Sequence, residues 1–415
     1  MAKEGDRVEI KTKEATYVGM IMPRSGLADK EHIILKLDNG YNIGLRKSEI
    51  VSEKLLKPET VPKETKPKIK IDKNLPQVSI LSTGGTIASK IDYKTGGVVA
   101  LTDADELMSS VPELQSLVNL KTKSVLNKMS EDLTPKAWGD IAEATAEELE
   151  KSDGVIITHG TDTMHYTSAA LSFMLQGLNK PVVLTGAQRS SDRGSSDSFM
   201  NLICAAHVAK SDIAEVTLVM HGTSDDEYCL INRGTRVRKM HTSRRDAFRS
   251  INASPIGKVW PDGKIEAVGY NKRGTGKIAL DTRFEEKTAL LKTYPGSNGE
   301  LLDSLIDAKF KGIVIEGTGL GHIPESWVNS IQRALDEGIA IVMTSQCLNG
   351  RVHAFVYAGS RRLSQAGVVY AEDMLPEVAY IKLGCVLGRG LNPKEEIPKN
   401  WAGEVSKRSG MEFLD

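Results

Sequence analysis

Two loops that combine glycine with threonine carry the residue types best suited to chemistry. One is LSTGGTIAS at residues 81–89, and the other is ITHGTDTM at residues 157–164. A hydroxyl nucleophile needs exposure at a sharp turn, and backbone N–H groups beside it can bind a developing oxyanion. Both loops offer these features, so the pair favours amide hydrolysis or another acyl transfer.

Phosphate binding and a purely structural role are the alternatives for these loops. Glycine-rich loops often bind phosphate, but neither stretch contains GxxxxGK[ST] or a complete GxGxxG, and EGTGLG at residues 316–321 is too short. In the structural alternative, the glycines make tight turns and the threonines cap helices, as is common where a strand leads into a helix. That role would be the better interpretation of a single loop, whereas two such loops favour a site.

A hydroxyl nucleophile also needs a base, and two residues are candidates. Asp162 directly follows Thr161, and Lys239 lies in RGTRVRKMHTSRRDAFRS, after the strand-like EVTLVMHG. A lysine acts as a base only when it loses its proton, which requires burial and a controlled hydrogen-bond environment. The simpler interpretation from position alone is that Lys239 belongs to a solvated basic hairpin.

The elements around these loops predict an α/β fold. From residue 78 onward, apolar strand-like runs alternate with longer amphipathic segments, which is typical of a mainly parallel sheet with helices on both faces. Ligands bind outside the carboxyl ends of such strands, where both loops fall. We predict a larger domain at 76–275 with the catalytic motifs and a smaller α/β domain at 294–415, separated by a polar stretch within 260–293.

The first part of the chain has a different pattern. Residues 1–55 show short alternating bursts and a hairpin turn at Asp38-Asn39-Gly40, which predict a small antiparallel β-barrel. Residues 56–75 are rich in lysine and proline, as expected for an extended linker.

Composition limits the possible functions. The 54 basic and 54 acidic side chains balance, so there is no global reason for tight binding to a polyanion. No apolar run approaches the roughly 20 residues of a membrane span and no signal segment is apparent, so we expect a cytoplasmic protein without membrane contact. The four cysteines lack CxxC spacing, so we expect buried, inert thiols and no metal site.

These motifs together carry a resemblance to a known family. STGGTIAS, THGTDTM, VVLTGAQR and the lysine of RKMHT resemble the L-asparaginase family of amidohydrolases over roughly residues 77–410. With a small barrel ahead of that body, the chain is also similar to the D subunits of archaeal glutamyl-tRNA(Gln) amidotransferases. The resemblance implies an asparaginase-like body of two α/β domains.

The resemblance also implies roles for individual residues. Thr86 would attack the side-chain amide carbon to give an acyl-enzyme as ammonia leaves, and Tyr93 would help to activate it. Thr161, Asp162 and Lys239 would orient and deprotonate the attacking species.

Substrate binding is implied in the same way for a neighbouring pair. Ser130 and Glu131 would hold the α-carboxylate and α-amino groups of glutamine or asparagine. The family often has glutamine where this chain has Glu131, which leaves charge matching to an ammonium group intact but puts the fine discrimination of amide donors in doubt.

Finally, the resemblance implies an assembly. This chain would form a homodimer within a heterotetramer, with an amidotransferase/kinase similar to the family's E subunit as partner. ATP and Mg are expected at that partner, which would also make most contacts with tRNA(Gln), and no cofactor or metal is expected in this chain. The alternatives are a freestanding L-asparaginase with an unrelated barrel, and a non-catalytic module that senses an amino acid.

Overall fold

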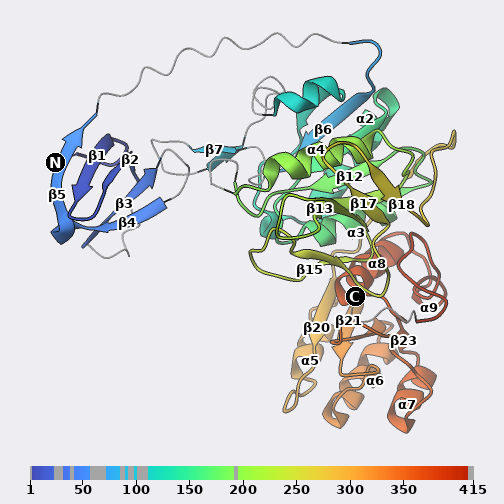
Figure 1. Ribbon diagram of the computed structural model, residues 1–415. Coiled ribbons are helices and arrows are strands. Elements are labelled where there is room, and N and C mark those ends of the chain that lie inside the picture. Colours follow the sequence, from blue (N-terminus) through green and yellow to red (C-terminus); the bar gives the residue numbers. More distant parts are fainter. Residues whose placement is uncertain are drawn as a thin grey trace.

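The protein, seen here as a computed structural model, is described for residues 2–22, 31–37, 42–56, 72–84, 89–91, 98–100, 111–190 and 195–409. Its N-terminal part is an antiparallel sheet ordered β4-β3-β2-β1-β5 (Figure 1), followed in the chain by residues outside this description. The strands are β1 (Arg7–Thr12), β2 (Thr16–Ile21), β3 (His32–Leu37), β4 (Asn42–Arg46) and β5 (Ile50–Leu55), with the 3-10 turn η1 (Lys47–Glu49) before β5. β3 and β4 form the hairpin predicted from the sequence, although the turn residues 38–40 lie outside the described part.

The central element is an eight-stranded sheet ordered β18-β17-β14-β13-β12-β10-β6-β9. Five neighbouring strands run parallel, and three antiparallel strands extend one edge. The parallel strands are β6 (Gln77–Ser82), β9 (Asn119–Ser124), β10 (Gly154–Thr158), β12 (Val182–Thr185) and β13 (Val216–His221), and the antiparallel ones are β14 (Cys229–Arg233), β17 (Gly257–Val259) and β18 (Ile265–Ala267). The predicted mainly parallel sheet is therefore confirmed, and its antiparallel edge was not foreseen.

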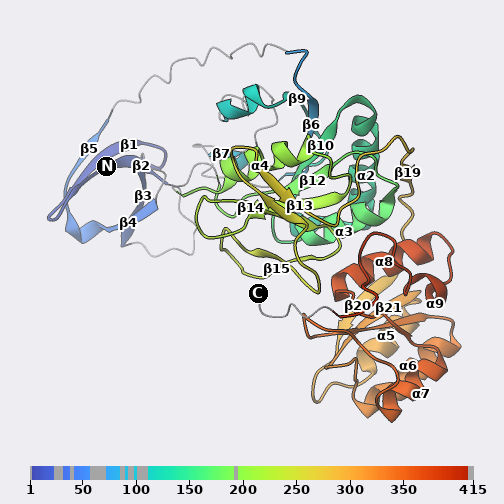
Figure 2. The ribbon, with the colours of Figure 1, turned by 45° about the vertical axis from the view of Figure 1, so that its right-hand side comes forward.

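Helices cover both faces of this sheet (Figures 1 and 2), and every residue of its central strand β10 is buried. Val155 and Ile157 pack with α2 (Pro135–Lys151) and α3 (Met164–Met174) on one face. Ile156 packs with α4 (Ser198–Ala209) on the other. Shorter elements connect these layers: β7 (Ser89–Ile91), β8 (Val98–Ala100), η2 (Pro112–Ser116), η3 (Ser130–Asp132), β11 (Leu175–Gln176), β15 (Val237–Lys239), β16 (Phe248–Ser250) and β19 (Ala279–Leu280).

A second, all-parallel sheet, ordered β20-β21-β22-β23, follows in the chain. One face carries α5, α6 and α7, and the other carries α8, which also packs against α3, so one hydrophobic core runs from the first sheet to the second. The bounds are β20 (Thr288–Lys292), α5 (Glu300–Asp307), β21 (Gly312–Gly317), η4 (Glu325–Trp327), α6 (Val328–Asp336), β22 (Ala340–Ser345), α7 (Ala358–Ala366), β23 (Val369–Tyr370), α8 (Pro376–Gly388) and α9 (Pro393–Glu396).

The cysteine prediction was wrong at one position. Cys204, Cys229 and Cys385 are buried, but Cys347 is exposed because it lies in the loop after β22 rather than within an element. Within the described ranges, no helix is long and apolar enough to cross a membrane. Nor do histidine, cysteine and acidic side chains gather there into a group that could hold a metal ion.

Candidate active site

The two glycine-threonine loops leave the central sheet side by side. β6 and β10 are parallel neighbours, and their last residues, Ser82 and Thr158, are paired. Thr83 then donates to the Thr158 carbonyl from both its backbone N–H, at 3.1 Å, and its hydroxyl, at 3.0 Å. Both loops therefore begin at the carboxyl edge of the sheet, where a ligand site is expected.

Glycine is required at the start of the first loop. Gly84 has a φ of +111°, and a Cβ there would lie 2.3 Å from the Lys128 carbonyl oxygen, so a side chain is excluded by both conformation and space. Thr86 and Tyr93, the predicted nucleophile and its activator, lie outside the described residues.

The structure brings Lys239 together with Thr161 and Asp162. Lys239 Nζ donates to Thr161 Oγ1 at 2.9 Å and to Asp162 Oδ1 at 2.7 Å. The lysine side chain is only 9% exposed, whereas that of Asp162 is 66% exposed. The alternative of a solvated Lys239 therefore does not describe this hairpin, which carries its lysine across to a loop 78 residues earlier in the chain.

Ser130 lies against the same loop. A Cβ on Gly160 would meet Ser130 Cβ at 2.9 Å, and Thr163 Oγ1 donates to the Ser130 carbonyl at 2.6 Å. Ser130 is buried and its hydroxyl lies 3.4 Å from Glu131 Oε2, while Glu131 itself is exposed. The Ser130–Glu131 pair and the Thr161 loop therefore lie next to each other. The buried hydroxyl of Ser130 lies beside Gly160, and the carboxylate of Glu131 lies at the surface.

The neutral side chain of His159 contacts the backbone of the loop that carries Thr161. Burial lowers the pKa of His159 to about 4. Its Nδ1 lies 2.6 Å from the Gly160 carbonyl oxygen, which only accepts hydrogen bonds, so Nδ1 carries the proton. Nε2 then accepts from the Thr167 hydroxyl at 2.8 Å. This arrangement ties the backbone next to Thr161 to the first turns of α3.

A second buried histidine, His165, lies close enough to Arg238 and Lys239 to be influenced by their charges. Burial, followed by the charges of Arg238 and Lys239, lowers the pKa of His165 to about 3. Its Nε2 is 3.9 Å from Glu377 Oε1, and burial raises the pKa of this glutamic acid. Glu377 belongs to α8 and its other oxygen accepts from Arg238 at 3.3 Å, so the smaller domain contacts the strand that carries Lys239.

The residues of VVLTGAQR, at 182–189, were assigned no individual role from the sequence. Gly186 follows β12, and a Cβ there would lie 3.1 Å from Thr161 Cγ2. Gln188 has a buried Nε2 atom without a hydrogen-bond partner among the described residues, at the same edge of the sheet. An unpaired buried amide next to these loops is a candidate for substrate contact, and the position directly after a central strand was the signal that could have identified it.

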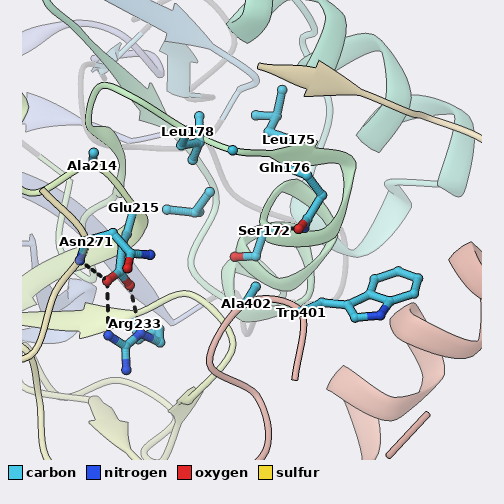
Figure 3. Close-up of a pocket in the computed structure, with 12 residues that line it drawn as sticks. Ser172, Leu175, Gln176, Leu178, Ala214, Glu215, Arg233, Asn271, Trp401 and Ala402 are labelled. Atoms are coloured by element: carbon cyan, nitrogen blue, oxygen red, sulfur yellow. Dashed lines mark hydrogen bonds and ion pairs between the residues drawn. The ribbon is translucent and has the colours of Figure 1, made fainter. Parts of the chain in front are cut away.

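One cavity in the described part of the chain lies away from these loops. It measures about 240 Å³ and is lined by Val216, which begins β13, and by Arg233, which ends the antiparallel β14. These positions mark the edge opposite to Thr161. Figure 3 shows the Glu215–Arg233 ion pair on one side of this cavity and Trp401 with Ala402 on the other, with no residue of the candidate site among them.

Comparisons with known proteins cover most of the chain in three pieces. Residues 2–56 match the GatD N-terminal domain, residues 77–272 the N-terminal domain of asparaginase, and residues 287–398 the glutaminase/asparaginase C-terminal domain. The D subunit of a glutamyl-tRNA(Gln) amidotransferase from Thermococcus kodakarensis is 54% identical, over 97% of this chain and 94% of its own. The corresponding D subunit from Methanothermobacter thermautotrophicus is 49% identical, over 99% and 95%.

The chain belongs to the family of glutamyl-tRNA(Gln) amidotransferase D subunits. Among solved structures, a thermostable L-asparaginase from Thermococcus kodakarensis matches 80% of this chain and 100% of its own, with a TM-score of 0.73 and 33% identity. L-asparaginase I from Vibrio cholerae matches 80% and 99%, with a TM-score of 0.70 and 30% identity. The predicted family, asparaginase-like α/β fold and class of enzyme are thereby confirmed.

Proposed function

We propose that this chain releases ammonia from glutamine or asparagine and supplies it to a partner protein that converts Glu-tRNA(Gln) to Gln-tRNA(Gln). The observation that carries the proposal is the contact of Lys239 Nζ with both Thr161 and Asp162 at the carboxyl edge of the central sheet. A hydroxyl, a carboxylate and a largely buried amine within hydrogen-bond distance are the groups that a threonine amidohydrolase needs to move a proton.

In the proposed reaction the Thr86 hydroxyl attacks the side-chain amide carbon. Lys239, held by Thr161 and Asp162, takes part in removing the proton of the attacking hydroxyl, and the proton passes to the leaving nitrogen so that ammonia departs. Water, deprotonated in the same way, then hydrolyses the acyl-threonine and releases glutamate or aspartate. Two successive acyl transfers replace one difficult hydrolysis.

Substrate binding is proposed for the pair Ser130 and Glu131. Ser130 lies beside Gly160, one residue before Thr161, which supports a role in holding the α-carboxylate of the amino acid. The exposed carboxylate of Glu131 carries the charge that would match the α-ammonium group. The side-chain amide of the substrate would then lie toward Thr161.

The proposed assembly follows from the chemistry of ammonia. Ammonia that escapes into water is protonated and loses its nucleophilic lone pair, so release must be coupled to a partner. We propose an amidotransferase/kinase partner, similar to the family's E subunit, that holds ATP and Mg, with two copies of this chain in a heterotetramer. Because this chain has no net charge, most contacts with tRNA(Gln) are assigned to the partner.

A freestanding L-asparaginase remains the second candidate, and one observation favours it. The Thermococcus L-asparaginase structure is matched over its full length by only 80% of this chain, so the body without the N-terminal domain corresponds to a whole protein. A non-catalytic sensor is less well supported because Lys239 is held against Thr161 and Asp162, a contact that sensing alone would not need.

One assay separates the three possibilities. Ammonia release from asparagine and from glutamine is measured with the purified chain, then with the amidotransferase/kinase partner, and then with partner and glutamyl-tRNA(Gln). We expect release that rises sharply when partner and tRNA are both present. Vigorous release that neither of them changes would identify a freestanding asparaginase. No release in any mixture would leave the sensor, and the Lys239→Met variant serves as the blank for contaminating activity.

A further inference from the structure

The hairpin that carries Lys239 is attached to the rest of the fold in an unusual way. β15 and β16 pair only with each other and form a separate two-stranded sheet. Their backbone therefore adds no hydrogen bonds to the ladder of the central sheet, so side chains must fix the position of the hairpin. Val237 and Phe248 pack into the core, but apolar packing has no directional preference of its own.

Directional polar contacts fix the hairpin at the turn that joins β15 to β16. This turn spans residues 240–247 and is closed by a 2.7 Å hydrogen bond from the Met240 N–H to the Ala247 carbonyl. Within it, Arg245 donates to Asp226 Oδ1 at 2.6 Å and to the Ser224 carbonyl. Both acceptors lie in the loop between β13 and β14, so Arg245 joins the turn directly to that loop.

From Asp226 the contacts continue into the core. Asp226 Oδ1 lies 3.0 Å from His221 Nε2, and Asn201 Oδ1 lies 2.6 Å from His221 Nδ1. Asn201 Oδ1 also accepts from the His221 backbone N–H at 3.0 Å. Asn201 and His221 are fully buried, so the hydrogen bonds between these two residues are shielded from water and correspondingly strong, whereas the Asp226 side chain is 67% exposed.

The contacts end at the backbone against which Thr161 packs. Asn201 Nδ2 donates to the Gly186 carbonyl at 3.0 Å and to Asp197 Oδ2 at 2.9 Å. The fully buried carboxylate of Asp197 also accepts from the N–H groups of Gln188 and Arg189, which fixes the turn that follows Gly186. Gly186 is the residue whose Cβ position lies 3.1 Å from Thr161 Cγ2.

We propose that Asn201, His221, Asp226 and Arg245 are positioning residues that set the place of Lys239 relative to Thr161. The chain of contacts runs from the backbone beside one member of the catalytic pair to the turn beside the other. None of the four residues touches Lys239 or Thr161 in a hydrogen bond of the described structure, so their effect is on geometry alone. The inference rests on the proposed amide hydrolysis.

The test uses two adjacent arginines of the same turn. Arg245 belongs to the chain of contacts, whereas Arg244 is 54% exposed and pairs with Asp246 inside the turn. Arg245→Ala and Arg244→Ala remove the same charge from neighbouring positions. Ammonia release is measured with the full-length chain, in whichever mixture of partner and tRNA gives the fastest release by the unsubstituted chain.

We expect Arg245→Ala to lower kcat by between about 10-fold and 100-fold, the range that a displacement of about 1 Å can cause, with KM changed much less. Arg244→Ala should stay within about twofold of the unsubstituted chain, because the Arg244 side chain is 54% exposed and Asp246 keeps its 2.7 Å ion pair with Arg249 when Arg244 is removed. Asp226→Asn should resemble Arg245→Ala, and the double variant should be no worse than either, because both break the same chain. Unchanged thermal melting would show that Arg245→Ala is folded, and Arg245→Lys, which keeps the charge, should recover part of kcat.

A second readout asks whether the effect passes through Lys239. In Lys239→Ala, a small free amine such as ethylamine can restore part of the rate, and this amine is not attached to the hairpin. Arg245→Ala should then leave the amine-restored rate unchanged. A restored rate lowered as much as in the parent chain would overturn the proposal, as would equal kcat values for Arg245→Ala and Arg244→Ala. If instead the unsubstituted chain releases no ammonia in any mixture, the proposed function itself fails and the inference with it.

Discussion

Acidification should destabilise the chain through His159, which is buried in its neutral form beneath the Thr161 loop. Burial lowers the pKa of this histidine to about 4, whereas a histidine in an unfolded chain has a pKa near 6.5. The replacement His159→Asn removes the titrating group and keeps an amide that can donate to the Gly160 carbonyl, as Nδ1 does now.

The sign follows from proton binding. Between pH 6.5 and pH 4 the unfolded chain binds a proton at this position and the folded chain does not, so stability is lost as the pH falls through this window. The difference between these two pKa values corresponds to about 3 kcal/mol in total at 1.36 kcal/mol per pKa unit. By the same linkage relation, relative to pH 7.0, about 1 kcal/mol is lost by pH 5.5 and about 2 kcal/mol by pH 4.5.

The assay compares guanidinium unfolding of the two proteins at pH 7.0, 5.5 and 4.5. Carboxylates and His165 titrate over the same range, but they are present in both proteins and cancel in the difference. His159→Asn should be the less stable protein at pH 7.0, because it loses the contact with Thr167, and its deficit should shrink by about 2 kcal/mol between pH 7.0 and pH 4.5. A deficit that does not change with pH would show that His159 is not held neutral, and the reasoning from burial would fail.

Four further substitutions or deletions test the proposed site. Thr86→Ala should abolish amide hydrolysis without lowering the melting temperature, and full activity with normal melting would exclude Thr86 as the nucleophile. Lys239→Met keeps the length of the side chain but cannot carry a proton, so the rate near pH 8 should fall by about 100-fold or more; an unchanged rate would return Lys239 to a structural role. Gly186→Ala places a Cβ 2.7 Å from the His159 carbonyl oxygen and 3.1 Å from Thr161 Cγ2, so kcat should fall, and wild-type kcat would argue against close packing there. Removal of residues 1–75 should spare hydrolysis and weaken tRNA-coupled transfer, whereas a folded but inactive truncated chain would place the N-terminal domain in the active site.

The sequence predicted those parts of the site that depend on residues close together in the chain. The apolar runs before each glycine-threonine loop predicted two buried parallel strands, and the pairing of Ser82 with Thr158 follows from that arrangement. Position alone did not predict the burial of Lys239. Its contact with Thr161 depends on β14 turning back antiparallel to β13, and an alternating sequence pattern does not reveal which strands pair.

The remaining features arise from tertiary contacts without a local signal. His221 looks like any polar residue at the end of a strand, and its contacts with Asn201 and Asp226 join three separate elements. The exposure of Cys347 likewise depends on how the loop after β22 lies on the surface. These contacts and this exposure depend on how distant segments pack together, and the local sequence pattern does not predict them.

The ion pairs of the arginines around Lys239 bear on whether this part of the chain binds nucleic acid. Six arginines between residues 233 and 249 would make a strongly basic patch if their charges were free. Each of them instead forms an ion pair with a carboxylate: Arg233 with Glu215, Arg236 with Asp373, Arg238 with Glu377, Arg244 and Arg249 with Asp246, and Arg245 with Asp226. Binding to phosphates gains its free energy by releasing counterions, and a guanidinium already neutralised by a protein carboxylate has few to release. Six arginines thus share five carboxylates, which leaves little unpaired positive charge in the cluster and is in keeping with the proposal that the partner makes most of the contacts with tRNA(Gln).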